Sequence, residues 1–230
     1  TLNEQQRLLA ESLEEVGDTL PLVNGVYADG SHAAVTVAKM STTEGASALL
    51  VFPPNSMSMG GQLRPEMALR HFQMVAEATD LPLILVQYPQ ATGLGYPVAT
   101  MEAIFDTVPS VVAIKDWCND PMLHEKHIRN FQSRQRPVNV LTTHSSWLMA
   151  SLSMGPAGLL SGAGSVIADL QVALFNAIRD NDLKRARQLN DCIYPLAQAF
   201  YRAPFLDMHN RMKECLVLLG RLEEAVVRPP

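Results

Sequence analysis

A six-fold repeat of a short apolar run followed by a helical segment constrains the fold most. The apolar runs cover 21–27, 48–52, 83–88, 111–117, 138–143 and 158–161. Mostly apolar runs of this length are typical of strands buried on both faces, as in parallel sheets. Successive runs start about 20 to 35 residues apart, the length of one strand-plus-helix unit. The repeat therefore predicts an α/β fold with parallel strands and helical crossovers.

The segments between the runs carry helical periodicity and helix-boundary residues. Ser31 is placed to cap the second expected helix, and Pro65 suits the first turn of the third. A helical tail follows the last strand. The expected helices cover 2–17, 33–44, 65–78, 99–107, 121–131, 146–154, 166–179, 183–201 and 206–219.

Two architectures fit this repeat: an open doubly wound sheet and a (β/α)8 barrel. No glycine-rich phosphate motif follows the first strand, which disfavours a dinucleotide-binding fold. A complete barrel has eight strands, whereas six are expected here. In a barrel, the carboxyl ends of all strands meet at one rim. The residues at those ends are Tyr27, Phe52, Tyr88, Lys115, Trp117, His144 and Ser161.

Composition excludes several classes of function. The net charge is −5, which gives no reason to expect nucleic acid or a membrane surface as a partner. No apolar run reaches the roughly 18 residues of a membrane span, and the first residues do not resemble a signal peptide. The three cysteines, Cys118, Cys192 and Cys215, are too scattered for a disulfide framework or a zinc site. We expect a soluble, cytoplasmic protein.

Lys115 lies near the end of the apolar run 111–117. Burying a lysine lowers its pKa and favours the neutral amine, which is the form that attacks a carbonyl carbon. The alternative is a lysine that reaches water or pairs with a carboxylate. Strand alternation puts Lys115 on the same face as Ala113 and Trp117, and it turns Asp116 to the opposite face, where a structural role is expected.

Four stretches, taken in order, resemble the dihydrodipicolinate synthase / N-acetylneuraminate lyase family. Residues 111–116, Val-Val-Ala-Ile-Lys-Asp, resemble its Schiff-base lysine strand. Residues 83–93 are similar to its strand ending in Tyr-Asn-x-Pro-x-Arg-Thr-Gly, and 155–161 to its eighth strand. Residues 210–219, with Lys213, resemble its Val-Lys-x-x-Leu-x-x-x-Gly helix. The resemblance covers nearly the whole chain.

The resemblance implies an incomplete (β/α)8 TIM barrel in which strands three to eight are present. Residues 1–180 would form this partial barrel, and 181–230 a C-terminal helical extension. Residue 1 aligns with the start of the second helix of the family, so the first two strands and a carboxylate-binding loop fall outside the sequence. We expect the chain to be a piece of a longer protein; the alternative is a product whose gap a partner chain fills.

The resemblance assigns Lys115 as the catalytic nucleophile that forms an imine with a 2-oxo acid such as pyruvate, with no cofactor and no metal. Three family positions differ. The tyrosine that relays protons falls at Val86, an arginine that binds a second carboxylate falls at Ala91, and an interface tyrosine falls at Asn55. Tyr88, two residues after Val86 on the same strand face, supplies a phenol from a shifted position or serves as a packing residue.

The other predicted site residues are substrate-binding: His144, Thr143, Ser161 and Gly162. His144 either contacts substrate or is a hydrogen-bonded rim residue, and Gly162 permits close approach of a ligand. His124 and His127 are expected on a solvated helix face, since no third metal ligand is apparent. Cys118 is expected to be an inert thiol. By resemblance the chain forms a homo-oligomer, a dimer or tetramer.

Two functions follow. The first is a class I, metal-independent lyase of the aldolase or dehydratase type, acting on a 2-oxo acid and an aldehyde, but not dihydrodipicolinate synthase itself. The second is a catalytically altered family member that acts as a small-acid binding or assembly protein. A phosphate-binding barrel is disfavoured, because no glycine-rich nest with basic residues ends the last two strands.

Overall fold

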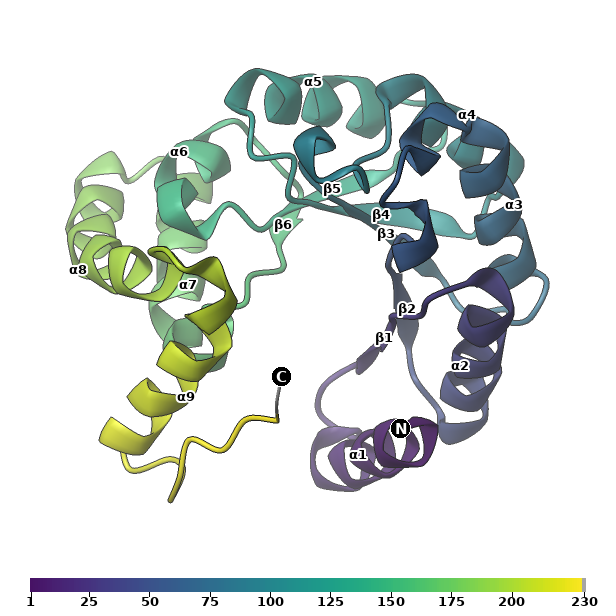
Figure 1. Cartoon of the computed structure of the whole chain (residues 1–230). Helices are drawn as coiled ribbons and strands as arrows, with labels where there is room; N and C mark the ends of the chain where they lie inside the picture. Colours follow the sequence, from purple (N-terminus) through teal and green to yellow (C-terminus); the bar gives the residue numbers. More distant parts are fainter. Residues whose placement is uncertain (229–230) are drawn as a thin grey trace. The chain divides into compact units, whose positions relative to one another are not determined.

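The computed structural model describes residues 1–228, in which six strands alternate with helices (Figure 1). The strands follow one another in the sheet in sequence order, and β1 to β4 pair in parallel. The predicted α/β class with a parallel sheet is therefore confirmed. The strands are β1 (Val23–Val26), β2 (Ala48–Val51), β3 (Leu83–Gln87), β4 (Val111–Asp116), β5 (Asn139–Thr142) and β6 (Gly158–Leu159).

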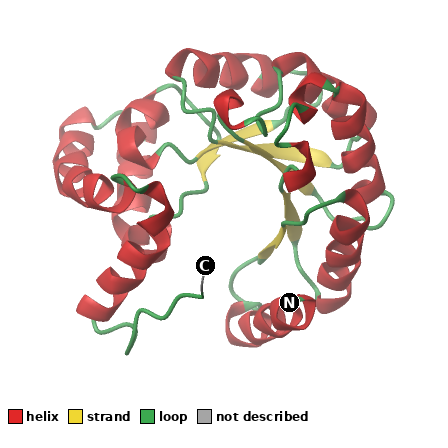
Figure 2. Cartoon of the chain, viewed as in Figure 1, coloured by secondary structure: helices red, strands yellow, loops and turns green. Residues whose placement is uncertain are grey.

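Each predicted helix is present, with its ends shifted by a few residues (Figure 2). Three local signals set helix boundaries: Gly45 ends α2 with a φ of 99°, Pro65 opens α3, and the Asp120 carboxylate caps α5. The helices are α1 (Leu2–Val16), α2 (Ser31–Glu44), α3 (Pro65–Ala76), α4 (Val98–Thr107), α5 (Pro121–Gln132), α6 (Leu148–Ser153), α7 (Gly164–Arg179), α8 (Leu183–Tyr201) and α9 (Met208–Leu218).

The predicted capping role of Ser31 is wrong. Helix α2 begins at Ser31 itself, its N-cap is Gly30, and no side chain caps it. The Ser31 hydroxyl instead lies 3.0 Å from Nδ1 of His71 on α3. The Ser31 hydroxyl therefore contacts α3 instead of capping α2.

The chain divides into two compact units, Thr1–Leu141 and Thr142–Pro230. In the first unit, α2, α3 and α4 lie along the same side of β1 to β4 (Figure 1). In the second unit, a core of apolar side chains from α6 to α9 includes Leu174, Leu189 and Phe200. None of the helices in residues 1–228 has the length and hydropathy required to cross a bilayer.

One face of the sheet in the first unit is covered by helices. Val51, Leu85 and Ile114 occupy aligned positions on β2, β3 and β4, and all three are fully buried. Because aligned residues of parallel strands point to the same side, these side chains form the face that the helices cover. Lys115 is displaced by one residue from Ile114, so it points from the opposite face.

Candidate active site

Lys115 lies at the carboxyl end of β4, directly opposite Val86 of β3. Its side chain is half-buried, and this burial lowers the pKa of the amine below that of an ordinary lysine. Burial is the only cause of the shift within residues 1–228. No carboxylate in this range raises the pKa of the amine again by pairing with its charge. A lysine with a lowered pKa holds a larger fraction of the neutral amine, which is the nucleophilic form.

Tyr88 and Trp117 lie one pleat beyond Val86 and Lys115 on the same face. Their ring centroids are 5.4 Å apart, and the Trp117 backbone N–H donates to the carbonyl of Gln87 at 3.0 Å. The Gln87 side-chain amide donates to the Tyr96 carbonyl and accepts from the Tyr96 N–H, both at 2.9 Å. This buried pair of hydrogen bonds fixes the loop that follows β3. Because Tyr88 lies in that loop, its position is fixed as well.

Burial raises the pKa of the Tyr88 phenol, and the neighbouring phenol of Tyr27 raises it further. Tyr88 therefore remains a proton donor at neutral pH. Val86, which the resemblance predicts to replace the relay tyrosine, is buried and has no polar atom in its side chain. Tyr88 is thus the phenol that follows Val86 along the Lys115 face.

Asn55 lies in a short 3-10 turn, Asn55–Met57, after β2. Its amide accepts a hydrogen bond from the Tyr27 hydroxyl at 3.1 Å and donates one to Asp29 at 3.0 Å. Ala91 lies in a second such turn, Gln90–Thr92, and is exposed. Asn55 therefore fixes Tyr27 rather than supplying a phenol, and Ala91 offers no charge to a second carboxylate.

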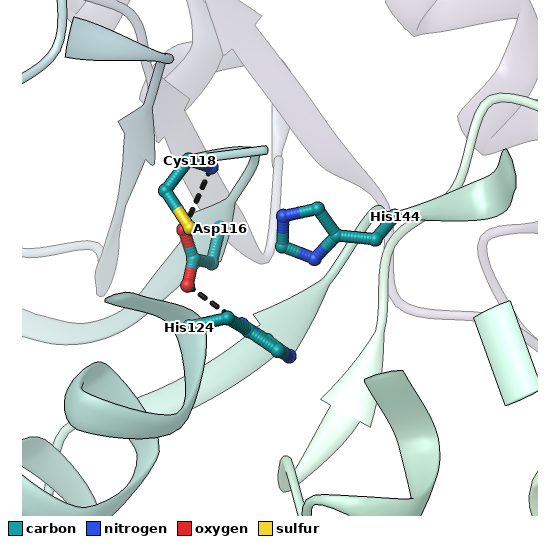
Figure 3. Close-up of side chains that lie close together, drawn as sticks. All are labelled: Asp116, Cys118, His124 and His144. Carbon is teal, nitrogen blue, oxygen red and sulfur yellow. Dashed lines mark hydrogen bonds and ion pairs between the residues drawn. The ribbon is translucent and has the colours of Figure 1, made fainter. Parts of the chain in front are cut away.

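The prediction of a solvated face for His124 and His127 is wrong. Both histidines are fully buried, and each Nδ1 lies 2.8 Å from Oδ2 of Asp116. Since a carboxylate can only accept, both Nδ1 atoms donate. Figure 3 shows Asp116 between the backbone of Cys118 and the ring of His124. Asp116 faces α5, which agrees with the structural role expected for it.

The side chains around Asp116 in the first unit include residue types that bind metals, but they are hydrogen-bonded to one another or to the backbone. Asp116, Cys118 and His124 offer atoms that lie within 4.8 Å of one another, the spacing of a metal site. However, Asp116 already accepts from both histidines and from the Cys118 N–H. Burial raises the pKa of the Cys118 thiol, and the charge of Asp116 raises it further. The thiol stays protonated and donates to the Asp120 carbonyl, so the geometry is that of a polar cluster.

His144 and Thr143 follow β5 in the second unit. His144 is buried; its Nδ1 lies 3.1 Å from the Thr142 hydroxyl, and its ring stacks on Trp147 with centroids 4.3 Å apart. These contacts lock the imidazole in one orientation. Thr143 is half-buried, and its carbonyl accepts from the N–H of Ser145.

Ser161 and Gly162 follow β6 in the same unit. The Ser161 hydroxyl lies 2.5 Å from that of Ser145 and accepts from the Gln171 amide at 2.9 Å. Gly162 is exposed, and a Cβ at that position would lie 3.9 Å from the Tyr201 hydroxyl. The four substrate-binding residues predicted from sequence therefore all fall in the second unit, whereas Lys115 and Tyr88 lie in the first.

Tyr201 is a residue that sequence reasoning missed. It comes from the end of α8, and its phenol lies by the side chains of Ser145 and Ser161. Burial raises its pKa, although hydrogen bonding to those serines and to the backbone at Ala163 acts in the opposite direction. An aromatic residue at a helix end is commonly part of a hydrophobic core, so no local sequence pattern marks Tyr201 as a site residue.

The fold and this geometry define a class of protein: a parallel α/β protein with a half-buried lysine at the carboxyl end of a strand and a phenol one pleat beyond it. The chain belongs to the dihydrodipicolinate synthetase family, whose model matches residues 1–230.

The chain is similar to several curated relatives. An uncharacterised DapA-like lyase of Halobacterium salinarum is 27% identical over 90% of this chain, and the chain spans 65% of that protein. A 4-hydroxy-tetrahydrodipicolinate synthase of Chlorobium limicola is 26% identical over 100% of this chain and 74% of its own length.

Solved structures share the fold. YagE of Escherichia coli K12, solved in complex with pyruvate, superimposes with a TM-score of 0.89 at 22% identity, over 100% of this chain and 75% of YagE. Dihydrodipicolinate synthase of Aquifex aeolicus gives a TM-score of 0.85 at 20% identity, over 99% of this chain and 74% of that protein.

Proposed function

We propose that this chain is a Schiff-base lyase of the class I aldolase type that acts on a 2-oxo acid such as pyruvate. The observation that carries the proposal is Lys115, a half-buried amine with a lowered pKa at a strand end, in a member of the dihydrodipicolinate synthetase family. YagE, which shares the fold, was solved with pyruvate bound. The protonated imine on Lys115 acts as the electron sink for cleavage or formation of a C–C bond, or for dehydration.

Tyr88 donates and accepts the proton at the substrate oxygen, because it remains protonated at neutral pH and lies on the face of Lys115. His144, Thr143, Ser161 and Gly162 bind the substrate. The activity differs from that of dihydrodipicolinate synthase, since Val86, Ala91 and Asn55 stand where that enzyme uses two tyrosines and an arginine. No cofactor or metal takes part in the proposed reaction.

The proposed architecture is that of six strands of a (β/α)8 barrel, corresponding to strands three to eight. Residues 1–180 contribute this part, and residues 181–230 form a C-terminal helical extension. The TM-scores with dihydrodipicolinate synthase and YagE support this assignment. A cytoplasmic location and a dimeric or tetrameric assembly complete the proposal.

A second function is favoured by the same substitutions. Val86, Ala91 and Asn55 remove three groups that support catalysis, while Lys115 is retained. A chain that forms the imine but turns nothing over would act as a small-acid binding or assembly protein.

Reductive trapping tests the proposal. Incubation with pyruvate and borohydride is expected to add one reduced pyruvate to Lys115, located by peptide mass spectrometry. Lys115→Arg should abolish the adduct, because a guanidinium does not form the imine, whereas Lys126→Arg on the exposed side of α5 should leave it unchanged. An adduct without turnover of any aldehyde would favour the binding function, and no adduct on Lys115 would refute both.

Replacing Tyr88 by phenylalanine separates chemistry from imine formation. The Tyr88→Phe variant is expected to retain trapping at Lys115 while kcat falls at least ~10-fold, because a general acid–base group is lost and the ring is kept. Tyr194→Phe, at an exposed position of α8, is the matched control. An unchanged kcat in Tyr88→Phe would make Tyr88 a packing residue.

A further inference from the structure

Aromatic side chains gather on the Lys115 face of the first unit. The strand register aligns Gly25 with Leu50, Leu50 with Ile84, and Ile84 with Ala113. Two residues further along β3 and β4, Val86 lies opposite Lys115. Continuing the same register places Tyr27, Phe52 and Val86 in one row that ends at Lys115. The next row holds Tyr88 beside Trp117. We call Tyr27, Phe52, Tyr88 and Trp117 the aromatic wall.

The members of the aromatic wall contact one another in pairs. Tyr27 meets Phe52 edge-to-face with centroids 5.4 Å apart, and Tyr88 meets Trp117 at the same distance with a tilt of 56°. Tyr27 is 53% exposed, and the other three are half-buried. Aromatic rings of the core would be fully covered, so the wall presents ring surface that a ligand can bury.

Local contacts hold the wall in place before any ligand arrives. The Tyr27 hydroxyl donates to Asn55, which in turn donates to Asp29. The Phe52 ring lies over Gly25, where a Cβ would make an ordinary van der Waals contact, 3.7 Å from Cε2 of that ring. Rings fixed in this way lose little conformational entropy when a ligand binds.

The two rows contain one basic side chain and no acidic one. In the rows just described, Lys115 is the one cationic residue, and its pKa is lowered. Ala91 is exposed in its turn and uncharged. A substrate whose second fragment carried a carboxylate would bury that charge against rings without a counter-ion, which costs binding energy.

We propose that the aldehyde fragment handled by this site is uncharged and aromatic, of the benzaldehyde class, and that the aromatic wall binds its ring. This inference rests on the proposed imine chemistry of Lys115 and names the second substrate. The hydroxyls of Tyr27 and Tyr88 give the wall two polar points at which a ring substituent or the aldehyde oxygen is bound.

The bond changes balance without an oxidant or reductant. The Lys115 amine condenses with the ketone of pyruvate and releases water, and the imine then loses a proton from its methyl carbon to form an enamine. That carbon bonds to the aldehyde carbon while the aldehyde oxygen takes up a proton. Water hydrolyses the imine, which frees Lys115 and a 4-hydroxy-2-oxo acid; cleavage is the reverse.

A panel of aldehydes tests the substrate class. With pyruvate, benzaldehyde is expected to give at least ~10-fold higher kcat/KM than glyoxylate or glyceraldehyde, because stacking on the wall is worth that factor. Tyr27→Ser should remove most of this preference by raising KM for benzaldehyde, with little change for acetaldehyde. Equal or higher kcat/KM for glyoxylate would overturn the proposal.

A binding measurement keeps the test independent of turnover. The chain has two tryptophans, so Trp147→Phe leaves Trp117 as the only indole. Benzyl alcohol, which forms no imine, is expected to change the Trp117 fluorescence saturably. Its affinity should be ~10-fold weaker when Tyr27→Ser is added. Saturable binding without pyruvate trapping would refute the imine function but retain the aromatic site, and trapping without saturable binding would refute the aromatic site alone.

Discussion

Replacing Asp116 by alanine is expected to destabilise the folded chain by about 3–5 kcal/mol. Asp116 is fully buried, and it accepts from His124, His127 and the backbone N–H of Cys118. Burial acts to raise its pKa, but the hydrogen bonds from the two histidines lower it strongly, so the carboxylate is charged. Without it, three buried donors lose their acceptor, and each unpaired group keeps its desolvation cost.

Urea unfolding at neutral pH measures this effect. Glu125→Gln is the matched control on the same helix, because Glu125 forms an exposed pair with Arg129 that is worth less than about 1 kcal/mol. Lys115 is adjacent in sequence, so pyruvate trapping should also weaken in Asp116→Ala. A loss below about 1 kcal/mol would show that water satisfies the two histidines.

A triple replacement separates the cost of unpaired donors from the net value of the cluster. Asp116→Leu with His124→Phe and His127→Phe removes the carboxylate and both imidazoles together, so of the three donors to Asp116 named above the backbone N–H of Cys118 remains. Buried ionic groups replaced in this way often cost little. The triple variant is therefore expected to be more stable than Asp116→Ala. If it is less stable, the hydrogen bonds of the cluster contribute net stability of their own.

The strand–helix repeat made the fold predictable, because apolar runs and the residues that bound helices are local signals. Pro65 opens α3, and Lys115 lies at the end of a buried strand, both as predicted from the sequence. Strand alternation also predicted that Asp116 points away from the Lys115 face, and Asp116 contacts the histidines of α5. These features depend on backbone periodicity, which a single sequence carries.

Polar side chains with distant partners were not predictable in the same way. His124 and His127 look like a polar helix face until Asp116, which lies on a strand, is placed beneath them. Ser31 looks like a cap until His71, 40 residues later, meets it. Tyr201 reaches Gly162 from a helix end. Each case depends on tertiary contact, which outweighs the local pattern.

The chain is expected to lose about 3 kcal/mol of stability as the pH falls from 6.5 to 4, through His71 alone. His71 is 1% exposed, and burial lowers its pKa from 6.5 to about 4, with only partial offset from the backbone of Phe52. Above pH 6.5 the imidazole is neutral in both states. Below that, the unfolded chain binds a proton that the folded chain does not, so acid favours unfolding.

Denaturant unfolding at a series of pH values measures the loss, and the difference between variants isolates His71 from the carboxylates. His71→Gln stays neutral at every pH and keeps a polar group facing Ser31, so its stability should decline less steeply between pH 6.5 and 4. His209→Gln, at an exposed position of α9, should follow the parent chain. Parallel curves for the parent and His71→Gln would mean that the folded chain accommodates the imidazolium, and that the Ser31 contact opens to water when it forms.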